Sequence, residues 1–141
     1  MSVHHVTDDE NKREKRALMP AIKRGLLGQC PHCGEGKLFR AYVKPVDNCS
    51  VCAQDFTAQR ADDLPAYLVI FLVGHITVGG FMATEMLTEW PGWMHLALWV
   101  PATIILSLIL LQPIKGGVIA LQWANYMHGF GSEDTSIVSQ V

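Results

Sequence analysis

The chain contains two short cysteine motifs, Cys30-Pro31-His32-Cys33-Gly34 and Cys49-Ser50-Val51-Cys52. Together they hold all four cysteines of the protein, and fifteen residues separate the two pairs, so the full pattern is C-x2-C-x15-C-x2-C. Two tight loops of this kind bring four sulfur atoms to the corners of a tetrahedron, which is the arrangement that structural zinc prefers. The sequence therefore predicts a metal site formed by Cys30, Cys33, Cys49 and Cys52.

The residues around the cysteines determine the expected geometry of each loop. Pro31 restricts φ in the first loop, and Gly34 permits a positive φ directly after the second ligand. The equivalent position after Cys52 is Ala53, so the second loop is less suited to the same turn. Because four thiolates fill every position of a tetrahedral zinc ion, we expect a structural site without an open position for water or substrate.

Two other interpretations of the cysteines stay open at this point. Iron in a tetrahedral sulfur cage is chemically possible, although zinc is favoured, and the cysteines could instead form two disulfides. The polar first sixteen residues have no apolar secretory region after them, which argues against an oxidising compartment. His32 lies inside the first loop, but four thiolates are already available, so we expect it to be exposed. Three basic residues between the pairs could offset the charge of the thiolates: Lys37, Arg40 and Lys44.

The distribution of charge is more informative than its sum. The chain has 141 residues and a net charge of −2, yet ten of its eleven Lys and Arg residues precede residue 61. Half of all residues are hydrophobic, and they concentrate between residues 64 and 130. This asymmetry indicates a membrane protein with a basic face on one side of the bilayer. The basic stretch near the start is short and mixed with acids, so no nucleic-acid partner is expected.

Two apolar segments are long enough to cross a bilayer. Residues 66–87 carry no charge before Glu85 and span about 33 Å as a helix, against a hydrocarbon core of roughly 30 Å. The second segment covers residues 94–112 and contains Pro101, which should kink it. The turn between them, residues 88–93, holds two tryptophans that suit the membrane–water interface. Small residues four apart in the first segment favour close helix packing, namely Gly79 with Ala83 and Gly80 with Thr84.

The resulting fold class is a small zinc ribbon with short β-hairpins, followed by an α-helical transmembrane hairpin and a C-terminal amphipathic helix. The predicted boundaries are a polar and basic tail at 1–23, a zinc-ribbon-like module at 24–60, a transmembrane hairpin at 61–113, an amphipathic helix at 114–130 and a flexible tail at 131–141. The run from Pro113 to Gly117 is expected to break the second span. The amphipathic helix is expected to lie in the interface or to pack under the ribbon.

The basic residues also predict an orientation. The module at 24–60 is rich in Lys and Arg, the turn at 88–93 has none, and Lys115 lies on the first side again. The positive-inside rule then places both termini and the zinc module in the cytoplasm, where thiols remain reduced and free for a metal.

A few ionisable residues lie within or beside the apolar segments. His75 is near the middle of the first span, where it could hold a cofactor, although a neutral histidine bonded to the backbone or to the facing helix is favoured. Glu85, Glu89 and His95 gather near the other end and could bind a cation, although interfacial carboxylates need no partner. We find no nucleophile–base motif, phosphate loop or HExxH motif, so no enzymatic activity is expected.

Several segments together resemble a family of small bacterial inner-membrane proteins of unknown function. The resemblance covers residues 24–127 and rests on the cysteine pairs, on the run Asp63-Leu64-Pro65-Ala66 and on the run Leu111-Gln112-Pro113-Ile114-Lys115-Gly116. It implies a zinc-ribbon-like cysteine set before two transmembrane helices. Because members are often encoded beside genes for heme-copper cytochrome c oxidase subunits and assembly factors, it also implies a role around that oxidase. The sequence departs from the family pattern at Ala53 and Leu64, where glycine is common.

Two functions of different classes follow. The first is a non-catalytic accessory protein of the bacterial inner membrane, in which the zinc ribbon docks a partner and the helices pack against a membrane complex such as cytochrome c oxidase. The second is a metal or redox carrier that uses the cysteine cluster or His75.

Overall fold

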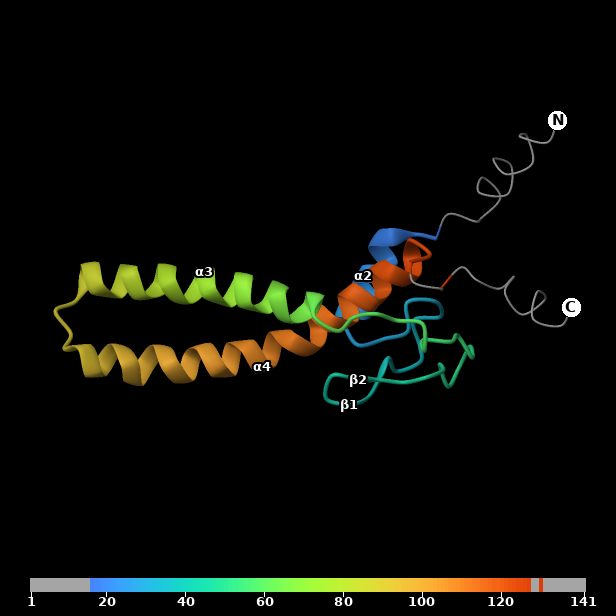
Figure 1. Ribbon diagram of the computed structural model, residues 1–141, viewed down its shortest axis with the longest axis horizontal. Helices are drawn as coiled ribbons and strands as arrows, with labels where there is room; N and C mark the ends of the chain where they lie inside the picture. Colours follow the sequence, from blue (N-terminus) through green and yellow to red (C-terminus); the bar gives the residue numbers. More distant parts are fainter. Residues whose placement is uncertain (1–15, 128–129, 131–141) are drawn as a thin grey trace, which may run out of the picture.

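The computed structural model describes residues 16–127 and residue 130, and within them the chain forms three helices and one short sheet. The predicted tail at 131–141, and most of the tail at 1–23, lie outside the described residues. The elements in order are α2 (Leu18–Leu26), β1 (Phe39–Ala41), β2 (Lys44–Pro45), α3 (Leu64–Leu87) and α4 (Gly92–Ala124). Figure 1 shows α3 and α4 as a long antiparallel pair, with the remaining elements gathered around one end of α4.

The helix pair agrees with the two predicted spans. α3 has 24 residues and α4 has 33, and both are long and apolar enough to cross a membrane. Pro65 occupies the first turn of α3, where its missing N–H has no helical partner to lose. Most apolar side chains of the pair are exposed, and Val69 and Val73 are the buried aliphatic residues of α3. An exposed apolar surface of this extent matches a lipid environment.

The predicted break between the second span and the amphipathic helix was wrong. α4 runs without interruption from Gly92 to Ala124, with Pro101 and Pro113 inside it. A proline within a helix removes one backbone hydrogen bond and bends the axis without ending the helix when the following turns are held in place. Figure 1 shows α4 changing direction where it leaves α3 and enters the module.

The contact between α2 and α4 holds those following turns in place. A Cβ added to Gly25 would lie 2.4 Å from the carbonyl oxygen of Gly116, and a Cβ added to Gly116 would lie 2.0 Å from the carbonyl oxygen of Gly25. The two backbones therefore touch at a point where only glycine fits. The glycines at 116 and 117 serve this helix crossing and do not end the helix.

The last turns of α4 pack against the cysteine-containing module and form part of its core. One buried cluster joins α2, the cysteine loops and this part of α4, and its members are Ala21, Cys30, Leu38, Phe39, Cys49, Phe56, Ala61, Val118, Ile119, Trp123, Ala124 and Phe130. The segment predicted to be amphipathic thus packs under the module, which was one of its two expected positions. Gln122 is buried as well, because its amide bonds the backbone N–H and carbonyl of Arg60 at 3.0 and 3.1 Å.

The sheet is a single antiparallel hairpin. β1 pairs with β2 in the register Phe39 to Pro45 and Ala41 to Lys44, and Tyr42 and Val43 form the turn. Two isolated bridges close the cysteine loops, one between Gln29 and Lys37 and the other between Asn48 and Asp55. Such short hairpins beside paired cysteines were expected for a zinc ribbon.

Candidate metal centre

The two cysteine loops have nearly the same backbone. In the first, the N–H of Gly34 bonds the carbonyl of Cys30 at 2.8 Å, and in the second the N–H of Ala53 bonds the carbonyl of Cys49 at 3.0 Å. Both residues have positive φ, 75° for Gly34 and 58° for Ala53. The second loop therefore adopts the expected turn even though an alanine occupies the glycine position.

The four sulfur atoms converge as a tetrahedral metal requires. All four lie within 4.8 Å of one another, and the pairs Cys30–Cys52 and Cys33–Cys49 are each separated by 3.7 Å. Zinc–sulfur bonds of 2.3 Å in a tetrahedron give sulfur separations of about 3.8 Å, so the arrangement fits a metal bound by four thiolates. All four cysteines are free, which excludes the two-disulfide interpretation. Iron has the same donor preference, so this geometry leaves the identity of the metal open.

The site has a buried side and an accessible side. Cys30 and Cys49 are buried, whereas Cys33 and Cys52 are half-buried. In the metal-free protein, burial raises the pKa of the Cys30 thiol to about 12 and also raises the pKa of Cys52. The backbone N–H groups of Gly36 and Glu35 lower the pKa of Cys33 to about 6. Of these three thiols, Cys33 is thus the most readily available as a thiolate.

Two residues at the site were not identified from the sequence. The Arg24 guanidinium donates to the carbonyl oxygens of Pro31 and His32 at 3.3 and 3.1 Å, which places a positive charge beside the first loop. Gly36 lies so close to the site that an added Cβ would be 2.2 Å from the Cys49 sulfur. Arg24 is in the last turn of α2, and only the fold brings it to the cysteines, so the loop sequence gave no signal for it.

His32 is exposed, as expected, and its ring makes a T-shaped contact with the Trp123 ring at a centroid distance of 5.7 Å. It is not among the residues whose donor atoms converge. Within the described residues, these four cysteines are the one group of three or more His, Cys, Asp or Glu side chains placed to hold a metal ion.

The residues singled out in the apolar helices fall into two places. The His75 ring is exposed on the outer surface of α3, and its Nδ1 lies 2.7 Å from the Phe71 carbonyl oxygen one turn earlier. This matches the favoured interpretation of a backbone-bonded histidine. Glu85 and His95 meet as expected, with Oε2 and Nε2 3.1 Å apart, while exposed Glu89 does not join them in a metal-binding group.

The contact between α3 and α4 uses one of the two small-residue pairs. The Trp99 ring lies against Gly80, where an added Cβ would be 2.1 Å from it, and its indole N–H donates to Thr84 Oγ1 at 3.3 Å. Gly79, in contrast, has no atom within 4 Å of such a Cβ. The pair Gly80 and Thr84 therefore faces α4, and Gly79 faces away from it.

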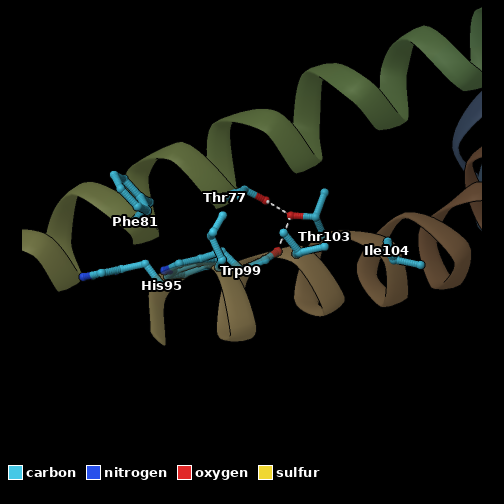
Figure 2. Close-up of a pocket in the computed structure, with 8 residues that line it drawn as sticks. Thr77, Phe81, His95, Trp99, Thr103 and Ile104 are labelled. Atoms are coloured by element: carbon cyan, nitrogen blue, oxygen red, sulfur yellow. Dashed lines mark hydrogen bonds between the residues drawn. The ribbon is translucent and has the colours of Figure 1, made fainter. Parts of the chain in front are cut away.

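A pocket of about 300 Å³ opens beside this contact, lined by Thr77 and Phe81 of α3 and by residues of α4 that include His95, Trp99, Thr103 and Ile104. Figure 2 shows Thr103 pointing toward Thr77 across the gap between the helices. Its hydroxyl groups are already paired, since Thr103 donates to the Trp99 carbonyl oxygen at 2.7 Å and lies 3.2 Å from the Thr77 hydroxyl. The other polar residue of its lining, His95, is paired with Glu85, and the remaining walls are apolar, so we assign the pocket no chemistry.

Fold and site together define a protein with two long apolar helices and, at one end of this pair, a module whose four cysteine sulfurs are placed to hold a metal ion. The chain belongs to the family described as Protein of unknown function (DUF983), whose family model matches residues 39–123. The match begins after the first cysteine pair and includes the second pair, α3 and nearly all of α4. Comparisons with curated proteins and with solved structures gave no match.

Proposed function

We propose that the protein is a non-catalytic accessory protein of the bacterial inner membrane, in which α3 and α4 cross the bilayer and the module binds a structural zinc ion in the cytoplasm. The observation that supports this most directly is the closed set of four sulfur ligands. Four thiolates leave no coordination position for water or substrate, so a bound zinc ion would stabilise the module and would not act on a substrate.

The outer face of α3 supports a partner within the membrane. His75 lies in a groove of about 490 Å³ on this face, together with Ile70, Phe71, Gly74, Val78 and Gly79. A polar imidazole that faces lipid is energetically unfavourable, and glycines allow a second helix to approach closely. A transmembrane helix of a larger complex would cover both. The family resemblance makes subunits and assembly factors of cytochrome c oxidase the first partners to test.

The test is purification from native membranes in mild detergent, with identification of every co-eluting protein by mass spectrometry. We expect stoichiometric recovery of a membrane complex with the wild type and its loss with Gly79→Leu, which fills the groove. Ala97→Leu adds the same side chain to an exposed position of α4 and should retain the complex. Purification of a zinc-loaded protein without companions would argue against the accessory role.

A second candidate is a metal or redox carrier, favoured by the partial exposure of Cys33 and Cys52 on one side of the site. Colour separates the alternatives, because heme gives a Soret band, iron bound by four thiolates is red and zinc is colourless. Rapid exchange of the bound metal with free metal in solution would favour the carrier, whereas slow exchange would favour a structural ion.

A further inference from the structure

The turn of the β1–β2 hairpin has an unusual composition for a turn in water. Tyr42 and Val43 are the two residues between the strands, and Val43 has a φ of 51°. Two-residue hairpin turns with positive φ are normally made by Asn and Gly, and a β-branched residue is strained in this conformation. Such strain persists only where the surroundings of the turn favour it, and the tip presents Tyr42, which is 47% exposed, beside the half-buried Val43.

The position of the turn along α4 identifies these surroundings. The Tyr42 hydroxyl donates to the carbonyl oxygen of Leu108. Leu108 lies sixteen residues after Gly92, the first residue of α4, which corresponds to about 24 Å along a helix. Because the hydrocarbon core is about 30 Å thick, the turn lies near the depth where hydrocarbon gives way to lipid headgroups.

The side chains around the turn match this depth. Arg40 and Lys44 are exposed on either side of it, and the segment from Phe39 to Pro45 contains no acidic residue. Leu26 and Leu27, at the adjacent end of α2, are 44% and 74% exposed. Tyrosine and apolar side chains flanked by basic residues are typical of a membrane interface. At the end of the helix pair next to the module, the acidic residues nearest in sequence to the helices are Asp62 and Asp63, which directly precede α3 and lie outside the turn.

We propose that the β1–β2 turn lies in the membrane interface and that Arg40 and Lys44 bind the phosphate groups of anionic phospholipids in the leaflet next to the module. The inference rests on the proposed function, because it requires α3 and α4 to cross a bilayer. Basic side chains at this level attract anionic lipids, and their aliphatic stems let the charged ends reach the headgroups. The hairpin thereby fixes the distance between the metal centre and the membrane.

The role of Arg40 and Lys44 in lipid binding is tested with the full-length metal-loaded protein in nanodiscs of phosphatidylcholine mixed with phosphatidylglycerol. Native mass spectrometry then counts each lipid that stays bound. We expect Arg40→Gln/Lys44→Gln to weaken retention of phosphatidylglycerol by about tenfold or more. Lys37→Gln/Arg60→Gln removes the same charge outside the turn and should retain the lipid. Lys37 pairs with Gln29 beside the first cysteine loop, and the backbone N–H of Arg60 bonds Gln122, about 20 Å further along α4 than Leu108. Equal losses in both double variants would overturn the proposal.

The depth of the turn is tested by hydrogen exchange in the same nanodiscs. Tyr42→Asn/Val43→Gly supplies a favourable hairpin turn, so it should preserve the fold while removing the apolar tip. We expect the wild-type turn to be protected and the Asn-Gly turn to exchange faster. A wild-type turn that exchanges as fast as the exposed loop around Val51 would contradict the inference. Failure of the wild type to enter nanodiscs would instead argue against the membrane location in the proposed function.

Discussion

The residues after the second and fourth cysteines show how far sequence alone defines the site. Gly34 and Ala53 occupy equivalent places in the two loops, and both have positive φ. Glycine adopts this conformation without strain, whereas alanine places a Cβ close to the next carbonyl oxygen at a cost of about 1 kcal/mol. The second loop is therefore held in a conformation that its own sequence disfavours, and bound metal would compensate for that strain.

This difference predicts that Ala53→Gly stabilises the metal-bound module by about 1 kcal/mol. The reverse change, Gly34→Ala, should destabilise it, both through strain and because the new Cβ would lie 2.9 Å from Arg24 Nε. Thermal unfolding of the zinc-loaded variants measures both effects. If Ala53→Gly lowered the stability, the loss would show that greater freedom in the unfolded chain outweighs the relief of strain.

The contrasting thiols predict how metal binding depends on pH. The pKa of Cys33 is lowered to about 6 and that of Cys30 is raised to about 12. At pH 7 to 8 a bound metal therefore displaces a proton from Cys30 but finds Cys33 already ionised. As the pH falls through about 6, Cys33 becomes protonated, so each metal should displace one further proton and the affinity should fall more steeply.

Calorimetric titration of the metal in buffers of different ionisation enthalpy measures the number of protons released. A Cys33→Ser variant removes this group and should abolish the additional release near pH 6, although its overall affinity will be lower. A proton count that stays constant between pH 5 and 8 in the wild type would contradict the assignment.

The ligands themselves were predictable because a C-x2-C pair is a local pattern, and its loop geometry follows from a few adjacent residues. The surroundings were not. Arg24 reaches the first loop from α2, and Gly36 is needed only because Cys49 comes from a distant segment. The basic residues closest in sequence to the cysteines, such as Lys37, do not identify the positive charge that lies at the site. That charge is Arg24, and its position depends on how α2 packs on α4.

At the scale of the elements, both ends of α3 and the start of α4 were predicted within two residues, because length and lack of charge are sufficient signals. The end of α4 was not, since the helix continues twelve residues beyond the predicted end of the second span at residue 112. The interpretation of Gly116 and Gly117 as a break was wrong, because the same residue type also permits close helix contact. Sequence gives no means to distinguish the two roles until the partner, Gly25, is known.

The crossing of α2 and α4 predicts a strong effect for Gly116→Ala. Its Cβ would overlap the Gly25 carbonyl oxygen, and backbone on both sides leaves little room to adjust, so we expect a loss of about 2–3 kcal/mol. Gly79→Ala is the matched control, since no atom lies within 4 Å of its Cβ and alanine favours the helix. Thermal unfolding in detergent compares the two. Equal stability of both variants would show that α2 does not pack on α4 as described.

At the scale of the whole molecule, the two parts obtain their stability differently. α3 and α4 satisfy their own backbone hydrogen bonds and would remain helical in lipid. The module between Gln29 and Arg60 contains five residues in regular strands, and two of its buried core residues are the metal ligands Cys30 and Cys49. Without a metal, the centre of that core consists of four thiols that converge with no ion to hold them together.

Removal of the metal should therefore unfold the module and leave the helix pair intact. Structural zinc contributes on the order of 10 kcal/mol in small zinc domains, which is comparable to the whole stability of a typical domain. After chelation we expect trypsin to cleave at Lys37 or Arg40, both exposed but held in the folded module, whereas Pro45 protects the bond after Lys44. The helical circular dichroism should change little, because α3 and α4 supply 57 of the 66 helical residues described (24 and 33, with 9 from α2). Loss of most of the helical signal on chelation would show instead that the helix pair depends on the module. Re-addition of zinc should restore protection from trypsin, and this recovery distinguishes reversible unfolding of the module from irreversible damage.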